Sequence, residues 1–139
     1  MSLIQISDLS THIYPEITDV ITRSDTSIVT NAINNAESEA KSYLNRFDIV
    51  AMFSPTYTDQ WLKSLVKDIA CWHLIKLANP NINMELFRAS YEDAISYFKN
   101  VMKGNFDPLW PLRVDDPETP FDESGHISSS SNIKRSNHY

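Results

Sequence analysis

The chain has 139 residues, of which 42% are hydrophobic, so it can form one core and has little room for a second. Its formal net charge of -6 disfavours binding to a phosphate backbone, and its single cysteine, Cys71, excludes an internal disulfide framework. No apolar run approaches the ~18 residues needed to span a bilayer, and the N-terminus lacks the pattern of a secretion signal. We therefore expect a one-domain protein that has no membrane span and stays where it is made.

The N-terminal region is predicted to form a hook of two short helices. Both glycines, Gly104 and Gly125, lie in the last third of the chain, so every residue before Gly104 is free of this helix-weakening residue. Ser7 can cap a short helical turn that reaches about Ile13, and Pro15 suits the first turn of a second helix that ends near residue 22.

The clearest amphipathic pattern covers residues 27–46, which should form a helix about 30 Å long. Its apolar residues recur at spacings of three and four, and they are Val29, Ile33, Ala36, Ala40, Leu44 and Phe47. The opposite face is polar and includes Glu37 and Lys41. We take Glu37 and Lys41 as candidate partner-binding residues on this face.

Two further long helices are predicted on either side of a proline-containing break at residues 79–81. Residues 48–58, with Pro55, form a loop that packs partly on the core, and Thr58 or Asp59 caps the first helix. This helix becomes apolar nearly all round towards residue 77, so it should be the central and most buried one. Asn83 caps the second helix, which Gly104 ends. The predicted fold class is thus all-α, a small bundle of three long helices with short N-terminal helices and an extended C-terminal arm.

The arm, residues 105–139, follows a helical body of residues 1–104. It holds four prolines and a cluster of carboxylates, and then a serine-rich end. Phe106, Trp110 and Phe121 are large apolar groups in this extended segment, so they are candidate anchors for a partner's groove. The alternative is that the arm folds back on its own body. Changing Trp110 to Ala is predicted to impair assembly while leaving the helix content intact.

The extreme C-terminus is locally basic because Lys134 and Arg135 are followed by no acidic residue. These two side chains are candidates for contact with an acidic partner or with DNA in a channel, and the alternative is an exposed solubilising tail.

A search for catalytic or metal-binding residues assigns none, and no cofactor. His73 is the only histidine in a predicted long helix, but Asp68 lies on a different face of that helix and Cys71 points away from His73. A buried or interface histidine explains His73 better than a hydrolase or metal site does. No glycine-rich phosphate loop is present.

Four stretches of the helical region, together with the opening residues 6–9, carry a resemblance to a known family. They are residues 36–47, 62–70, 91–95 and 103–104, with the sequences AESEAKSYLNRF, LKSLVKDIA, YEDAI and KG. In order and spacing they resemble the Mu-like phage head-completion proteins, small helical neck subunits of tailed phages. The resemblance covers residues 4–105 and a Ser-Ser-Asn tail at 130–132, and it departs from the family pattern at residues 48–58 and 107–123.

The resemblance implies a structural virion protein, a head-to-tail connector in the phage neck, and no catalysis. It implies a homo-oligomeric ring of twelve copies that assembles in the host cytoplasm beneath the portal, continues the DNA channel and offers the tail a docking surface. The portal and other neck or tail proteins would be its partners. The alternative from the residues alone is a small cytoplasmic helical adaptor or regulatory module that binds another protein through the polar face of residues 27–46.

Overall fold

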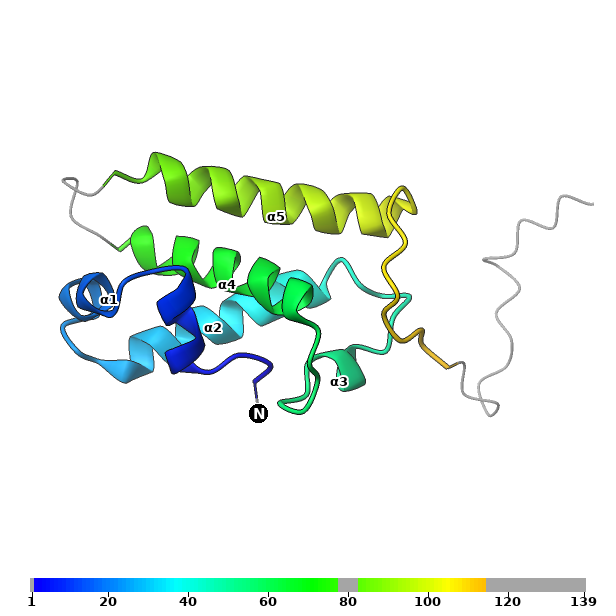
Figure 1. The fold of residues 1–139 in the computed structure, drawn as a ribbon, viewed down its shortest axis with the longest axis horizontal. Helices are drawn as coiled ribbons and strands as arrows, with labels where there is room; N and C mark the ends of the chain where they lie inside the picture. The colour runs from blue at the N-terminus through cyan, green and yellow to red at the C-terminus, as the bar shows by residue number, and fades with distance from the viewer. Residues whose placement is uncertain (1, 78–82, 115–139) are drawn as a thin grey trace, which may run out of the picture.

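The computed structural model describes residues 2–77 and 83–114, and within them every regular element is a helix (Figure 1). In chain order the elements are η1 (Ile6–Thr11), α1 (Pro15–Thr22), α2 (Thr26–Lys41), α3 (Ile49–Met52), α4 (Gln60–Ile75) and α5 (Glu85–Lys103). This confirms the predicted all-α class, with three long helices and a short N-terminal pair. Within the same residues, no helix is both long enough and apolar enough to cross a membrane.

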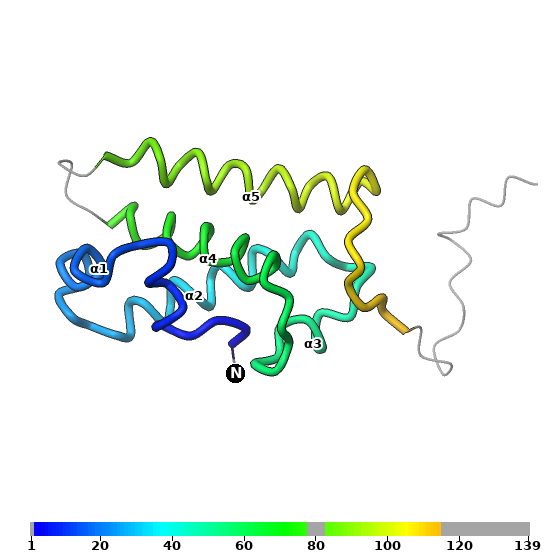
Figure 2. Tube along the Cα trace, in the orientation of Figure 1, coloured from blue at the N-terminus to red at the C-terminus, as the bar shows by residue number. Residues whose placement is uncertain are grey.

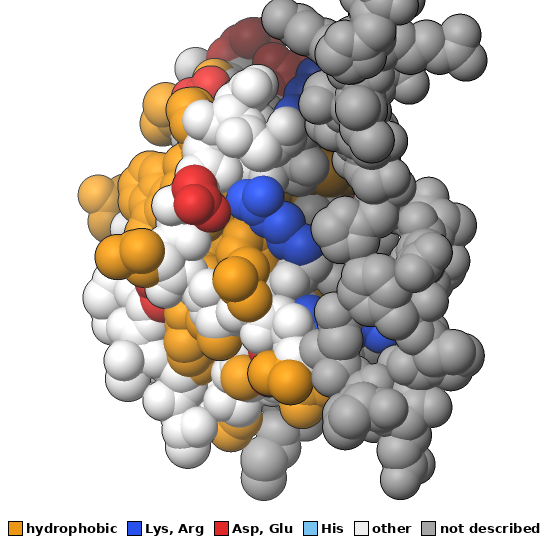
Figure 3. All heavy atoms as spheres, turned by 90° about the vertical axis from the view of Figure 1, so that its right-hand side faces the viewer, with side chains coloured by type: hydrophobic (Ala, Val, Ile, Leu, Met, Phe, Trp, Pro, Cys, Tyr) orange, Lys and Arg blue, Asp and Glu red, His pale blue; other side chains and the backbone are white. Residues whose placement is uncertain are grey.

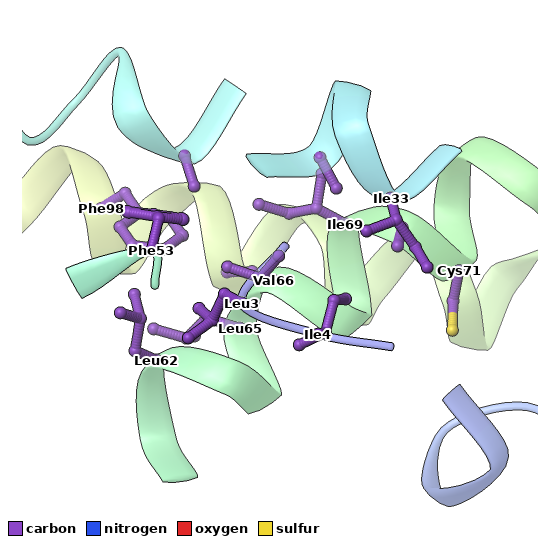
Figure 4. Close-up of a cluster of buried hydrophobic side chains, with 14 of the residues drawn as sticks. Leu3, Ile4, Ile33, Phe53, Leu62, Leu65, Val66, Ile69, Cys71 and Phe98 are labelled. Atoms are coloured by element: carbon purple, nitrogen blue, oxygen red, sulfur yellow. The ribbon is translucent and has the colours of Figure 1, made fainter. Parts of the chain in front are cut away.

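Helix α4 is the centre of the core, as its nearly all-round apolar sequence predicts. α2 and α5 pack on it from two sides, and η1 and α1 also contact it. Its Leu62, Val66 and Ile69 have no exposed surface. Figure 4 shows Leu65 and Val66 of α4 beside Leu3, in a buried cluster that also contains Ile33 of α2 and Phe98 of α5. One hydrophobic core therefore joins the hook to all three long helices.

Aspartate side chains cap the N-termini of α2, α3 and α4. Asp25, Asp48 and Asp59 each accept a hydrogen bond from a backbone N–H in the first turn, of α2, α3 and α4 respectively. Such N-caps satisfy donors that have no partner inside the helix. Of the two residues predicted to cap α4, Asp59 is the cap. Gly104 ends α5 at its C-terminus, as predicted. Its φ of 83° lies in the left-handed region, which suits glycine.

Two predicted boundaries are corrected by the structure. Helix α2 ends at Lys41 instead of near residue 46, because the chain turns there while Leu44 and Phe47 remain buried. The predicted loop 48–58 contains the one-turn helix α3, which begins at Ile49 directly after its N-cap Asp48. The cap formed by Asp48 thus starts the short helix α3 in a stretch whose sequence shows no helical apolar periodicity.

The start of the arm lies against the helical body. Phe47 and Leu112 form an antiparallel bridge, the N–H of Asp48 donates to the carbonyl of Pro111 at 2.9 Å, and the N–H of Arg113 donates to the carbonyl of Arg46 at 3.0 Å. The tube in Figure 2 shows this segment passing beside the connection between α2 and α3. The remaining arm residues, 115–139, lie outside the described residues.

Candidate partner interface

Trp110 anchors the arm to the body of its own chain. Its ring packs edge-on against Phe47 with centroids 5.6 Å apart and also contacts Tyr97 and Phe98. Its indole N–H donates to Asp59 Oδ2 at 3.1 Å, and the side chain is only 5% exposed. Of the two alternatives that the sequence leaves open, the structure shows the fold-back, which corrects the choice of Trp110 as a partner anchor.

Three apolar residues near Trp110 are exposed to solvent. Leu109 is 101% exposed and Leu112 is 63% exposed, and Val114 further along is 84% exposed. The N–H of Trp110 donates to the carbonyl of Pro108 at 2.8 Å, which makes Leu109 the central residue of a γ-turn, and its side chain faces solvent while that of Trp110 is buried. We call Leu109, Leu112 and Val114 the arm patch. Leu109 and Leu112 are apolar residues of the proline-containing arm and could have been chosen from the sequence, but the sequence interpretation chose the tryptophan.

The arm patch lies at the end of the molecule that also carries Phe106, which is 43% exposed and packs against Tyr97 with ring centroids 5.2 Å apart. Figure 3 looks onto this end, where several apolar side chains are exposed beside basic and acidic ones. Exposed apolar groups gathered on one surface are typical of binding sites. Phe106 stays a candidate interface residue, now as part of the edge of this surface.

Glu37 does not belong to an exposed polar face. Its side chain is 4% exposed, and its Oε1 accepts hydrogen bonds from the backbone N–H of Leu3 at 2.7 Å and of Ile4 at 3.5 Å. Burial raises the pKa of this carboxyl. Glu37 follows Ile33 by four residues and therefore shares its side of α2. This corrects the partner-binding assignment, since Glu37 fastens the N-terminal segment to α2.

Lys41, the other candidate on α2, is half-buried, with its Nζ 5.0 Å from the ring centroid of Phe53. This cation–π contact ties the end of α2 to the segment after α3. The candidates Phe121, Lys134 and Arg135 lie outside the described residues, and their interface roles stay predictions.

A polar cluster joins the three long helices around Glu39 of α2. Its Oε2 lies 3.1 Å from His73 Nε2 on α4, and its Oε1 accepts a hydrogen bond of 2.6 Å from the phenol of Tyr91 on α5. Burial, followed by the Glu39 carboxylate, raises the pKa of Tyr91 to about 12. His73 thus has a structural partner and does not pair with Asp68. The thiol of Cys71 is buried, and burial raises its pKa to about 12, so it is not a thiolate at neutral pH.

A second polar cluster fastens the hook to α4 and superficially resembles a catalytic triad. His12 Nε2 lies 3.1 Å from Ser64 Oγ and 3.6 Å from Asp68 Oδ1, while Thr11 Oγ1 lies 2.8 Å from Nδ1. In a triad the carboxylate and the serine bind opposite ring nitrogens, whereas here both face Nε2. Burial, helped by Lys67, lowers the pKa of His12, so the ring is neutral near pH 7 and makes no salt bridge with Asp68 there.

Neither cluster offers a metal site. Among residues 2–77 and 83–114 there is no group of three or more His, Cys, Asp or Glu side chains that could hold a metal ion. The sequence interpretation missed the His12 cluster because Thr11 and His12 are more than 50 residues away from Ser64 and Asp68 along the chain. The hydrogen bonds of both clusters are explained by a structural role, because they link one helix to another.

The comparisons with known proteins point to one family. No curated protein and no solved structure matches the chain. A family model described as "Bacteriophage Mu, Gp36" matches residues 2–125, a range that contains the hook, the three long helices and the arm patch. The resemblance to Mu-like phage proteins is therefore confirmed at the level of a phage family. The chain belongs to the Bacteriophage Mu Gp36 family.

Proposed function

We propose that the chain is a structural virion protein, a head-to-tail connector subunit of the phage neck that joins the portal to the tail and continues the DNA channel. Membership of a phage family supports a role in the particle. The observation that carries the proposal is the arm patch, in which two leucines and a valine are held in solvent on an arm that Trp110 locks to the body.

A locked arm suits assembly for an energetic reason. Pro108 and Pro111 restrict the backbone on both sides of Leu109 and Trp110, and two backbone hydrogen bonds hold residues 111–113 against residues 46–48. A partner that binds the arm patch therefore loses little conformational entropy. The proposed partners are further copies in a ring of twelve, the portal, and other neck or tail proteins.

The proposal assigns no reaction to the chain. His73 and His12 both have close partners that fasten helices together, and the buried Cys71 thiol is unsuited to nucleophilic attack. DNA passing through the ring would meet a chain of formal net charge -6, which favours proximity without tight binding.

The assembly state tests the proposal. Light scattering coupled to gel filtration would give the mass of the purified chain alone and after mixing with the portal and tail-proximal proteins of its phage. A ring, formed alone or only with these partners, is the expected result. A chain that stays monomeric or dimeric and binds no virion protein would contradict the proposal and favour the adaptor alternative.

A matched pair of variants sharpens this measurement. Leu109→Ser is expected to weaken assembly because it removes an exposed apolar group from the arm patch. Leu86→Ser is the control, since Leu86 is also exposed but lies at the start of α5, away from the arm. Equal effects of the two substitutions would mean that the arm patch has no special part in assembly.

A further inference from the structure

We propose that Leu109 of one copy inserts into an apolar hollow in the N-terminal hook of the next copy, so that neighbouring subunits of the proposed ring join arm to hook. This inference rests on the proposed function and names the contact that would build the ring.

The hollow lies between η1 and α1. It has a volume of about 170 Å³, and its apolar wall is formed by Ile6, Leu9, Ile13 and Pro15. A cavity of about 150 Å³ with apolar walls is large enough to take up a benzene molecule. The hollow is therefore the right size and character for one leucine side chain.

Leu109 has the matching properties. Its side chain is fully exposed, and the burial of Trp110 beside it fixes the direction in which it projects. Within residues 2–77 and 83–114, no packing contact accounts for a leucine held in solvent at this position. A buried site on another molecule would account for it, because removing apolar surface from water is favourable.

The charged residues around this hollow complement Arg113 of the arm, and those around the two other large hollows in the described residues do not. Asp19 lines it, and Glu16 is exposed in the first turn of the same helix. On the arm, Arg113 is exposed four residues after Leu109, and its backbone is bonded to that of Arg46. Insertion of Leu109 would thus bring the guanidinium of Arg113 near the carboxylates of Glu16 and Asp19 on α1.

The other two hollows lack this complement. One, of about 460 Å³, lies beside Pro55 and has no charged residue in its lining. The other, of about 430 Å³, lies between α2 and the end of α4 and contains Lys76 and His73 but no carboxylate. Lys76 would repel Arg113. Both hollows are also larger than one leucine requires.

The positions of the two surfaces point to a second copy as the occupant. The hook helix α1 and the arm lie at opposite ends of the molecule (Figure 1). A contact between two different surfaces is heterologous, and its repetition gives a closed ring or an open filament. A contact of arm patch with arm patch would instead end at a dimer.

Cysteine cross-linking tests the contact directly. Leu109→Cys and Ser10→Cys variants are purified separately, mixed, and oxidised, with assembly followed by light scattering, alone and with the portal protein present. Ser10 is exposed and lines the hollow. The expected result is a disulfide-linked pair in the mixture and none in either variant alone. The buried Cys71 is kept, and the unsubstituted chain is the control.

Two results would overturn the inference while sparing the proposed function. One is a cross-linked pair in Leu109→Cys alone, which would mean an arm-to-arm contact. The other is an assembled mixture without the cross-link. An unsubstituted control chain that stays monomeric even with the portal would overturn both proposals, and the light-scattering mass distinguishes that case.

Charge reversal gives a second readout. Arg113→Glu and Asp19→Arg are each expected to weaken self-association about tenfold or more, and the double variant is expected to recover most of the loss. Lys76→Glu is the control, because Lys76 lines the rival hollow between α2 and α4. Loss with Lys76→Glu, or no recovery in the double variant, would contradict docking in the hook.

Discussion

Trp110 and Asp59 share one hydrogen bond that links the arm to the start of the central helix. The indole N–H of Trp110 donates to Asp59 Oδ2 at 3.1 Å, while Asp59 Oδ1 accepts from the backbone N–H of Leu62 at 2.8 Å. A single carboxylate therefore caps α4 and holds the arm. The outward direction of Leu109 depends on this carboxylate as well as on the packing of the Trp110 ring.

Asp59→Ala is expected to lower the free energy of unfolding by about 2–3 kcal/mol. The loss combines a missing helix cap with an indole N–H left without a partner in a buried site. Asp25→Ala is the matched control, because Asp25 caps α2 through Ser27 and has no bond to the arm, so a smaller loss than that of Asp59→Ala is expected. Urea unfolding followed by circular dichroism measures both. Equal losses would mean that the bond to Trp110 contributes nothing.

Trp110→Ala is expected to lower the free energy of unfolding by about 3–5 kcal/mol, because it removes a large side chain from an aromatic cluster. The sequence alone suggested that this variant would impair assembly and leave the helix content intact, but removal of a buried tryptophan should lower stability as well as assembly. Leu109→Ala is the cleaner probe of assembly and should change stability by no more than about 0.5 kcal/mol. A Trp110→Ala variant as stable as the unsubstituted chain would show that the arm does not pack in solution.

Tyr91→Phe is expected to lower the free energy of unfolding by about 1–2 kcal/mol, since Glu39 loses its shortest hydrogen bond. The remaining partner of that carboxylate would be His73. Tyr14→Phe serves as the control because Tyr14 is exposed and should leave stability unchanged within about 0.5 kcal/mol. The result to be looked for in thermal and urea unfolding is a clear difference between the two variants. Equal stability of the two variants would mean that the hydrogen bond from Tyr91 to Glu39 does not stabilise the fold.

The stability of the chain should contain a pH-dependent contribution from Asp68. Burial, followed by the charge of Asp93, raises the pKa of Asp68 from its ordinary 3.8 to about 6. Between these values the folded chain holds a proton that the unfolded chain releases, so stability falls as pH rises from about 4 to about 6. The side chain is partly exposed, and the expected loss is roughly 1–3 kcal/mol.

Asp68→Asn isolates this contribution because the amide stays neutral at every pH. The variant should match the unsubstituted chain near pH 4 and become the more stable of the two above pH 6. Urea unfolding at a series of pH values measures the difference between the two chains, in which the other carboxylates cancel. A difference that is constant across this range would rule out a raised pKa for Asp68.

Local sequence patterns predicted most of the helical architecture. Spacings of three and four, the capping Asp59 and the terminal Gly104 act within a few residues of one another, so they can be recognised along the chain. The boundary that failed, at the end of α2, depends on tertiary packing. Leu44 and Phe47 continue the apolar pattern past Lys41 because the turns that carry them also face the core.

The candidate site was harder to predict because it depends on contacts between distant residues. Trp110 meets Asp59 across 51 residues, and Tyr91 meets Glu39 across 52. The sequence interpretation identified the arm correctly as a place with large apolar groups, but it could not decide which would face the body. Glu37 was misassigned for a similar reason, since its hydrogen-bond donors, the N–H groups of Leu3 and Ile4, come from the chain's N-terminus.

The most direct test of the connector role is electron microscopy of particles made by the phage when the gene for this chain is disrupted. DNA-filled heads and finished tails that remain separate are the expected result, and adding the purified chain to such a lysate should join them and restore infectivity. The Leu109→Ser variant should restore less than the Leu86→Ser control. Normally joined, infectious particles without the chain would contradict the connector role.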